Sequence, residues 1–182
     1  PFHATFRAGA GSVMSAFNDI NGVPASANTF TLRTVLRQEW DFKGVVLSDW
    51  NAVGELIPHG LATDLKQAAL KAATAGVDMD MVSDAYHDHL VALVQEDAAP
   101  VSLVEEAARR VLRLKMMLGL FENPYADEGI AEEIILRPAY RETALEICRK
   151  SMVLLKNETG LLPLAEDTGR IALIGPLADD HH

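Results

Sequence analysis

The sequence predicts an α/β fold made of consecutive βα units that share one parallel sheet. Three short apolar runs, at residues 12–18, 44–49 and 77–81, have the length and composition of strands. They begin roughly 32 residues apart, which is the size of a strand plus a crossover helix. Because the residues between them are apolar at helical spacing, a helix is expected after each of the first two strands.

The helices between these strands carry start and stop signals. Asn28 can cap the first helix, whose apolar residues fall on one face at Leu32, Val35, Leu36 and Trp40. Asp64 and Gln67 form a possible capping box for the second helix. Gly76 can end that helix, because glycine readily adopts the left-handed conformation of a helix C-terminus.

The second strand is the most informative element, because a Val-rich run from Gly44 leads directly into Asp49 and Trp50. Such a strand is typical of sheets covered on both faces, and in parallel barrels the active site lies at the carboxyl ends of the strands. Asp49 could act there as a nucleophile, a base or a metal ligand, and Trp50 offers a flat face for a sugar ring. The alternative is that Asp49 caps the next loop and Trp50 packs internally.

A third helical region follows residue 81 in two parts. Residues 86–94 form the first part, and Pro100, with a capping box of Ser102 and Glu105, begins the second, which ends at Gly119. This second helix is expected to pack through Val104, Ala107, Ala108, Val111, Leu114 and Leu118. Its opposite charges lie three to four residues apart and are expected to form a solvated face, at Glu105, Glu106, Arg109, Arg110 and Lys115.

The character of the sequence changes after Phe121, where polar and helix-breaking residues indicate a linker. The predicted organisation is βα units over 1–121, a linker with a connecting helix (139–155) over 122–168, and the start of a second α/β domain over 169–182. Residues 170–176 resemble a buried strand that would need neighbours to complete its hydrogen bonds. We therefore expect the sequence to be an internal piece of a longer chain.

Composition narrows the class of function. The residues are 49% hydrophobic and 23% charged, which is ordinary for a globular protein, and no apolar run approaches the roughly 20 residues of a membrane span. The formal net charge of −10 argues against a nucleic-acid partner. Cys148 is the one cysteine, so no internal disulfide is expected and we interpret it as core packing.

Metal and nucleotide chemistry are not indicated. The histidines form no metal-ligand pattern, and only His59, in the loop after Asp49, is placed near the predicted site. Gly175 and Pro176 could be taken for a phosphate loop, but the sequence has neither of the glycine-rich signatures of nucleotide binding. Neither a metal nor a cofactor is predicted.

Several motifs resemble, in order, the glycoside hydrolase family 3 β-glucosidases, and most closely their periplasmic bacterial type. In the predicted βα region they are VMSAFNDINGVPA (13–25), LRQEWDFKG (36–44), SDW (48–50), AGVDM (75–79), AARRVLRLK (107–115) and GLF (119–121). Beyond it, SMVLLKN (151–157), LPL (162–164) and IGPLAD (174–179) are similar to the start of that family's second domain. The resemblance implies the C-terminal part of a (β/α)8 TIM-like barrel, a linker and the first strand of an α/β sandwich domain.

The resemblance also implies roles for individual residues. Asp49 would be the nucleophile of a retaining β-glucosidase that hydrolyses terminal non-reducing β-D-glucosyl residues through a covalent glycosyl-enzyme. Trp50 would stack on the aglycone. Phe17 stands where many relatives carry Tyr, so it would line the substrate site without a donor hydroxyl. The implied partner is a β-glucoside or small oligosaccharide, and the implied location is periplasmic or secreted.

The family's acid/base carboxylate and the residues that grip the sugar match no motif in this sequence, so they would come from the rest of the polypeptide. An isolated fragment is accordingly expected to be inactive. Three alternatives remain: β-xylosidase or arabinofuranosidase activity on the same framework, and a noncatalytic carbohydrate-binding module. The family's β-N-acetylglucosaminidases are disfavoured, because they usually carry an acidic residue where this sequence has Trp50.

Overall fold

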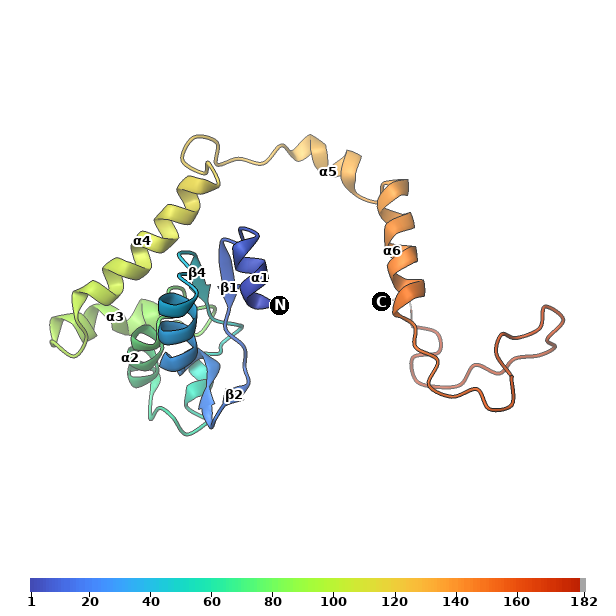
Figure 1. Ribbon diagram of the computed structural model, residues 1–182, viewed down its shortest axis with the longest axis horizontal. Coiled ribbons are helices and arrows are strands. Elements are labelled where there is room, and N and C mark those ends of the chain that lie inside the picture. The colour runs from blue at the N-terminus through green and yellow to red at the C-terminus, as the bar shows by residue number, and fades with distance from the viewer. Residues whose placement is uncertain (181–182) are drawn as a thin grey trace. The chain divides into compact units, whose positions relative to one another are not determined.

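The computed structural model describes residues 1–180 and every side chain among them except that of residue 132. The chain forms two compact units, Pro1–Tyr125 and Ala126–His182. The first unit contains α1 (Phe2–Arg7), β1 (Ser12–Met14), β2 (Asp19–Ile20), β3 (Val23–Pro24), η1 (Ala25–Ala27), the π-helix η2 (Phe30–Glu39), β4 (Val45–Leu47), η3 (Gly54–Leu56), α2 (Leu65–Ala75), α3 (Ala85–Gln95) and α4 (Val101–Met117) (Figure 1). The second contains α5 (Glu128–Ile134) and α6 (Pro138–Ser151).

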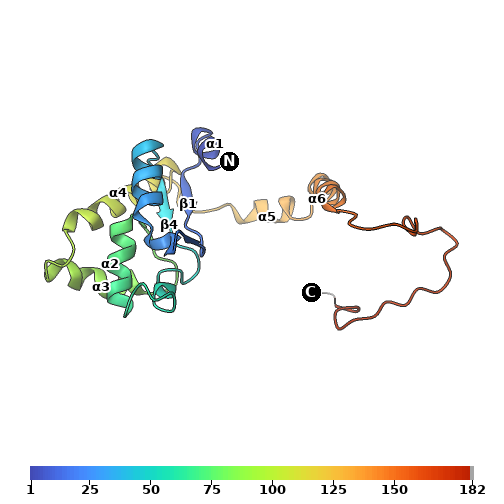
Figure 2. The same ribbon diagram turned by 60° about the horizontal axis from the view of Figure 1, so that its bottom comes forward.

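Strands β1 and β4 are parallel, as the sequence predicts, and lie side by side in both views (Figures 1 and 2). Val13 is opposite Val46 in their register. The strands begin very close together, since a Cβ on Gly44 would lie 2.2 Å from the carbonyl oxygen of Gly11. Only glycine fits at this position, which explains the residue that opens the second predicted strand.

The first predicted strand, 12–18, is shorter than expected. It ends at Met14, and an antiparallel hairpin of β2 and β3 follows it. The hairpin turns at Asn21 and Gly22, which both have positive φ, at 54° and 75°. Asn-Gly is the preferred pair for a two-residue hairpin turn, so local turn chemistry ends the strand here.

The third predicted strand, 77–81, is also corrected by the structure, which reduces it to one parallel bridge between Leu47 and Met79. The physical reason lies in the Asp78 side chain. Its Oδ2 accepts the hydrogen bond of the Val46 backbone N–H at 2.9 Å, so a carboxylate occupies the donor that a longer ladder would use.

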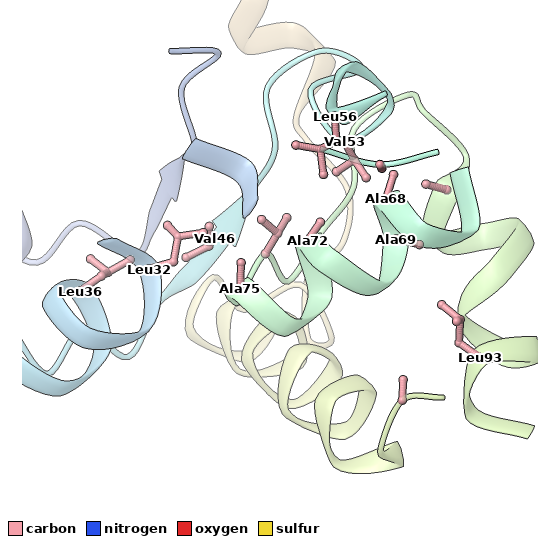
Figure 3. Packing of buried hydrophobic residues seen from close by; sticks show 14 of the residues in the cluster. Leu32, Leu36, Val46, Val53, Leu56, Ala68, Ala69, Ala72, Ala75 and Leu93 are labelled. Carbon is pink, nitrogen blue, oxygen red and sulfur yellow. The ribbon is translucent and has the colours of Figure 1, made fainter. Parts of the chain in front are cut away.

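A core of buried side chains joins these elements (Figure 3). Leu32 and Leu36 of η2 lie on one side of Val46, and the alanines of α2 lie on the other. Four of those alanines, Ala68, Ala69, Ala72 and Ala75, are fully buried. Their small side chains allow α2 to pack closely against its neighbours, among which α3 makes the most extensive contact.

The predicted caps of the first two helices are confirmed. Asn28 Oδ1 accepts from Thr31 N at 3.0 Å before η2. Asp64 Oδ1 accepts from Gln67 N at 2.8 Å, and Gln67 Oε1 accepts from Thr63 N at 2.9 Å. Gly76 ends α2 with φ of 109°, in the left-handed region.

Helix α4 departs from the sequence prediction in two ways. It begins at Val101 after Pro100 without a side-chain cap, so the capping box of Ser102 and Glu105 does not form. It also buries no residue fully, and a hollow of about 380 Å³ separates part of its apolar face from α2 and α3. Of the predicted packing residues, Val104, Ala107, Val111 and Leu114 are half-buried, whereas Ala108 and Leu118 are exposed. Ion pairs add to this partial apolar attachment.

The expectation of a solvated charged face holds for Glu105, Glu106, Arg109 and Lys115, which are exposed, and is wrong for Arg110. Arg110 Nη1 of α4 lies 2.8 Å from Asp78 Oδ1, and Arg37 Nη2 of η2 lies 2.7 Å from Asp78 Oδ2. The Asp78 side chain is only 1% exposed. Burial lowers the pKa of Arg37 to about 10, although Asp78 opposes the shift, so this guanidinium remains charged at neutral pH. Glu106 is paired as well, with Arg33 and Arg110.

In the second unit, α6 confirms the predicted connecting helix, ending at Ser151 instead of residue 155. Neither a strand nor a bridge forms over residues 170–176, because no other described segment donates or accepts the ladder hydrogen bonds that a strand needs. Cys148 is exposed, contrary to the predicted core packing, since α6 buries no residue. None of the helices within residues 1–180 has the length and apolar composition to cross a membrane.

We predict that Asp78→Ala lowers the free energy of unfolding of the first unit by about 3–5 kcal/mol, because it leaves two buried guanidinium groups without their partner. Urea unfolding followed by the fluorescence of Trp40 and Trp50 measures the effect. Glu96→Ala is the matched control, since the Glu96 carboxylate pairs with Lys66 on the surface and its loss is expected to cost about 0–1 kcal/mol. Equal effects of the two substitutions would contradict the central role of Asp78.

Candidate active site

Three segments meet at the carboxyl edge of the sheet. Ser15 N donates to Leu47 O at 2.9 Å, so the residues after β1 lie beside the end of β4. Ser48 N donates to Met79 O at 2.9 Å, which brings the third segment to the same edge. The structure therefore gathers Phe17, Asp49 and Trp50, the three residues predicted for the site, around the ends of neighbouring parallel segments.

Asp49 follows β4 and is half-buried. Its Oδ1 accepts a hydrogen bond from the backbone N–H of Trp50 at 2.6 Å. Its carbonyl oxygen accepts from Ala52 N at 3.1 Å and closes a turn in which Asn51 has φ of 55°. Among residues 1–180 no side chain donates a hydrogen bond to the Asp49 carboxylate.

The turn after Asp49 is fastened to Met81 at two points. Met81 N donates to Ser48 Oγ at 2.8 Å, and Asn51 N donates to Met81 O at 2.9 Å. The two bonds hold the residue before Asp49 and the second residue after it to the same residue, Met81. Ser48 is fully buried, at 0% exposure.

Several large apolar side chains of the three segments are not buried. Trp50 is 64% exposed and Phe17 is 40% exposed. Met14, Met79 and Val82, from the other two segments, are exposed as well. The alternative in which Trp50 packs internally is therefore not what the first unit shows, and its indole is free to contact a ligand.

His59, the histidine predicted to lie near the site, joins the loop after Asp49 to the β2–β3 hairpin. Its Nδ1 lies 3.2 Å from Asp19 Oδ1. Asp80, which neighbours Met81, accepts hydrogen bonds from the Ser83 hydroxyl at 2.7 and 2.6 Å on its two oxygens. Both side chains thus have partners that shape the loops of the site.

A hollow of about 380 Å³ lies at the opposite, amino end of the strands, between α1, the loop at 40–44 and α4. It is lined by Gly11 and Gly44, which precede β1 and β4. Asp49 lies on an open edge instead of in this hollow. Within residues 1–180, no three side chains of His, Cys, Asp or Glu gather closely enough to hold a metal ion.

The sequence interpretation assigned no role to Ser48 and Asp78, whose side chains bond to the backbone next to the site. Asp78 could have been found, because a carboxylate inside a buried strand must have a partner, and Arg37 and Arg110 lie on adjacent predicted helices. Ser48 could not have been found this way. Its role depends on which peptide its hydroxyl meets, and no local pattern specifies that.

Comparison with known proteins agrees with this geometry. Residues 1–114 match the family described as "Glycosyl hydrolase family 3 N terminal domain". The periplasmic beta-glucosidase of Salmonella typhimurium is 41% identical over 184 residues, which cover 98% of this chain and 24% of that protein. A putative beta-xylosidase of Formosa agariphila is 37% identical over 183 residues, covering 99% of this chain and 24% of that protein.

Solved structures give the same result. The beta-glucosidase from Listeria innocua superposes with a TM-score of 0.80 at 43% identity, over 90% of this chain and 23% of that one. The chain thus spans about a quarter of the length of the relatives that it matches.

Proposed function

Because the chain belongs to glycoside hydrolase family 3, we propose that it is the part of a retaining β-glucosidase that carries the nucleophile, Asp49. The observation that carries the proposal is the placement of Asp49 at the carboxyl edge of parallel strands. There its carboxylate is accessible, and the exposed indole of Trp50 is its immediate neighbour. This is the edge at which barrel enzymes bind their substrates.

In the proposed reaction an Asp49 oxygen attacks the anomeric carbon of the sugar, and the bond to the leaving oxygen breaks. A second carboxyl group protonates the leaving oxygen and later removes a proton from water, which attacks the same carbon and releases Asp49. The hydrogen bond from Trp50 N to Asp49 Oδ1 holds one carboxylate oxygen against the turn.

The proposal assigns the remaining machinery to other parts of a longer polypeptide. These parts would complete the (β/α)8 barrel and supply the acid/base and the groups that grip the sugar. Two observations support this: the chain spans about a quarter of its relatives' length, and the second unit exposes large apolar side chains that a folded neighbour would cover, among them Leu155, Leu173 and Ile174. Residues 122–168 would act as the linker, and 169–182 as the start of the second α/β domain.

Glucose is the proposed sugar. Structures of the Listeria innocua relative have been determined in complex with glucose and with laminaribiose. Xylose is the second candidate, because beta-xylosidases of Formosa agariphila match at 37% identity. A periplasmic location is proposed from the Salmonella typhimurium relative. The noncatalytic carbohydrate-binding alternative keeps the exposed Trp50 but gives Asp49 no covalent role.

We predict that a 2-deoxy-2-fluoro-glucoside with a good leaving group labels the full-length enzyme on Asp49. The fluorine slows release of the glycosyl-enzyme, so the adduct accumulates. Mass spectrometry of the peptide that contains Asp49 measures it, with Asp49→Asn as the control.

The labelling result separates the candidates. Faster labelling by the matching 2-fluoro-xyloside would indicate a xylosidase. A folded protein that binds glucosides yet is labelled by neither reagent would refute the nucleophile and favour the binding module.

We predict that Trp50→Ala raises KM for aryl glucosides by about 3- to 10-fold, because the indole is proposed to stack on the leaving group. Trp50→Phe, which keeps a flat ring, is expected to lose less. Steady-state kinetics measure both. The release of the trapped sugar from Asp49 should be unchanged in Trp50→Ala, because the leaving group has already departed, and a large change in release would place Trp50 on the sugar instead.

A further inference from the structure

We propose that Ser48 is a positioning residue for Asp49 and that it acts through the backbone of Met81. This inference rests on the proposed function, since it assigns to Ser48 the alignment of the nucleophile with the anomeric carbon. It begins from the sparse support of the Asp49 side chain. Within the described part of the chain, that carboxylate receives one hydrogen bond, from the next residue's own backbone.

Because the carboxylate has so little side-chain support, its position depends on the backbone around it. Residues 48–51 are held mainly by the Met79–Met81 segment. Ser48 N donates to Met79 O at 2.9 Å, Ser48 Oγ accepts from Met81 N at 2.8 Å, and Met81 O accepts from Asn51 N at 2.9 Å. Of these three bonds, the one to Ser48 Oγ is the only one that uses a side chain.

The Met79–Met81 segment follows Asp78, whose backbone and side chain are both fixed by hydrogen bonds. Asp78 N donates to Val46 O at 2.7 Å, and the buried Asp78 carboxylate is held by Arg37 and Arg110. The segment is therefore anchored before it reaches Met81. The hydrogen bond between Met81 N and Ser48 Oγ links this anchored segment to the turn that contains Asp49.

An unusual backbone conformation lies next to the hydrogen bond between Met81 N and Ser48 Oγ. Val82, which follows Met81, has φ of 74°, and Asn51 has φ of 55°. A β-branched residue rarely adopts a positive φ, and it persists there only where the surroundings impose it. The hydrogen bond between Met81 N and Ser48 Oγ is one of the restraints next to Val82, so its loss removes part of what fixes this segment.

Ser48 acts indirectly, through Met81. It is fully buried, and among residues 1–180 its hydroxyl is bonded to Met81 N and makes no hydrogen bond with the Asp49 carboxylate. Water cannot easily replace it at a fully buried position. Substitution to Ala leaves the Met81 N–H without an acceptor.

The test uses the full-length enzyme and the 2-deoxy-2-fluoro-glucoside trap. For each variant two quantities are measured: the final fraction of chains labelled on Asp49 and the rate constant of labelling. The fraction reports folded, competent enzyme, and the rate constant reports alignment of the attack. We expect Ser48→Ala to reach nearly the wild-type fraction while its rate constant falls by about 10- to 100-fold, because small misplacements of reacting groups are costly.

Tyr86→Phe is the matched control. It also removes one buried hydroxyl that bonds to the same stretch of backbone, since Tyr86 Oη donates to Val77 O at 2.8 Å. That bond lies at the other end of the segment from Met81. Tyr86→Phe should therefore label at a rate within about threefold of wild type, even where its thermal stability falls as much as that of Ser48→Ala.

The outcomes are distinguishable. If the wild type is not labelled on Asp49, the proposed function fails. If the wild type is labelled and Ser48→Ala labels at the same rate, the function stands and the positioning role is overturned. Should Ser48→Ala fail to fold, Ser48→Cys carries the test by the same rate criterion, because sulfur fills the site but is a weaker acceptor.

Discussion

The buried carboxylate of Asp78 is the interaction on which the rest of the first unit depends. It accepts hydrogen bonds from Arg37, Arg110 and the backbone of Val46, and thereby joins η2, α4 and β4 at one point. A buried charge is costly unless it is fully paired, so these three partners are held to one geometry. The shortened third strand, the ionic part of the attachment of α4 and the path of residues 79–81 all follow from it.

The two ends of the strands have different physical character as a result. At the amino end, Gly11 and Gly44 approach closely and Arg37 donates to the carbonyl oxygens of Phe42 and Gly44, at 2.8 and 2.6 Å. The amino ends of the two strands are therefore held together by close backbone packing and by the hydrogen bonds of Arg37. At the carboxyl end, large apolar side chains of the segments that meet near Asp49 stay exposed, although burial would be favourable. Under the proposed function, the rest of the barrel and the substrate cover this surface.

Much of this could be predicted from the sequence, because the signals involved are local. The caps at Asn28 and Asp64, the stop at Gly76 and the parallel order of the first two strands depend on residues close together in the chain. The Asn21-Gly22 turn is an equally local signal, and it ends the first strand before the apolar run ends.

The features that could not be predicted depend on contacts between residues that are far apart in the sequence. Arg110 matches the pattern of a solvated helix face, yet it reaches a carboxylate 32 positions away. The strand at 170–176 needs neighbours from outside its own segment, so its pattern alone could not establish it. Placement of Asp49 and Trp50 at the site was predictable from the strand that precedes them, whereas the bonds that orient them were not.

The motifs at 48–50 and 75–79 are therefore one structural unit, although a helix separates them in the chain. The Asp78 carboxylate accepts from the backbone N–H of Val46, three residues before Asp49. The Met79–Met81 segment is hydrogen-bonded to Ser48, before Asp49, and to Asn51, after it. A substitution in either motif changes the geometry of the other. The position of the Asp49 carboxylate is accordingly a property of two neighbouring segments bonded through buried polar groups, and its own side-chain contacts contribute little to it.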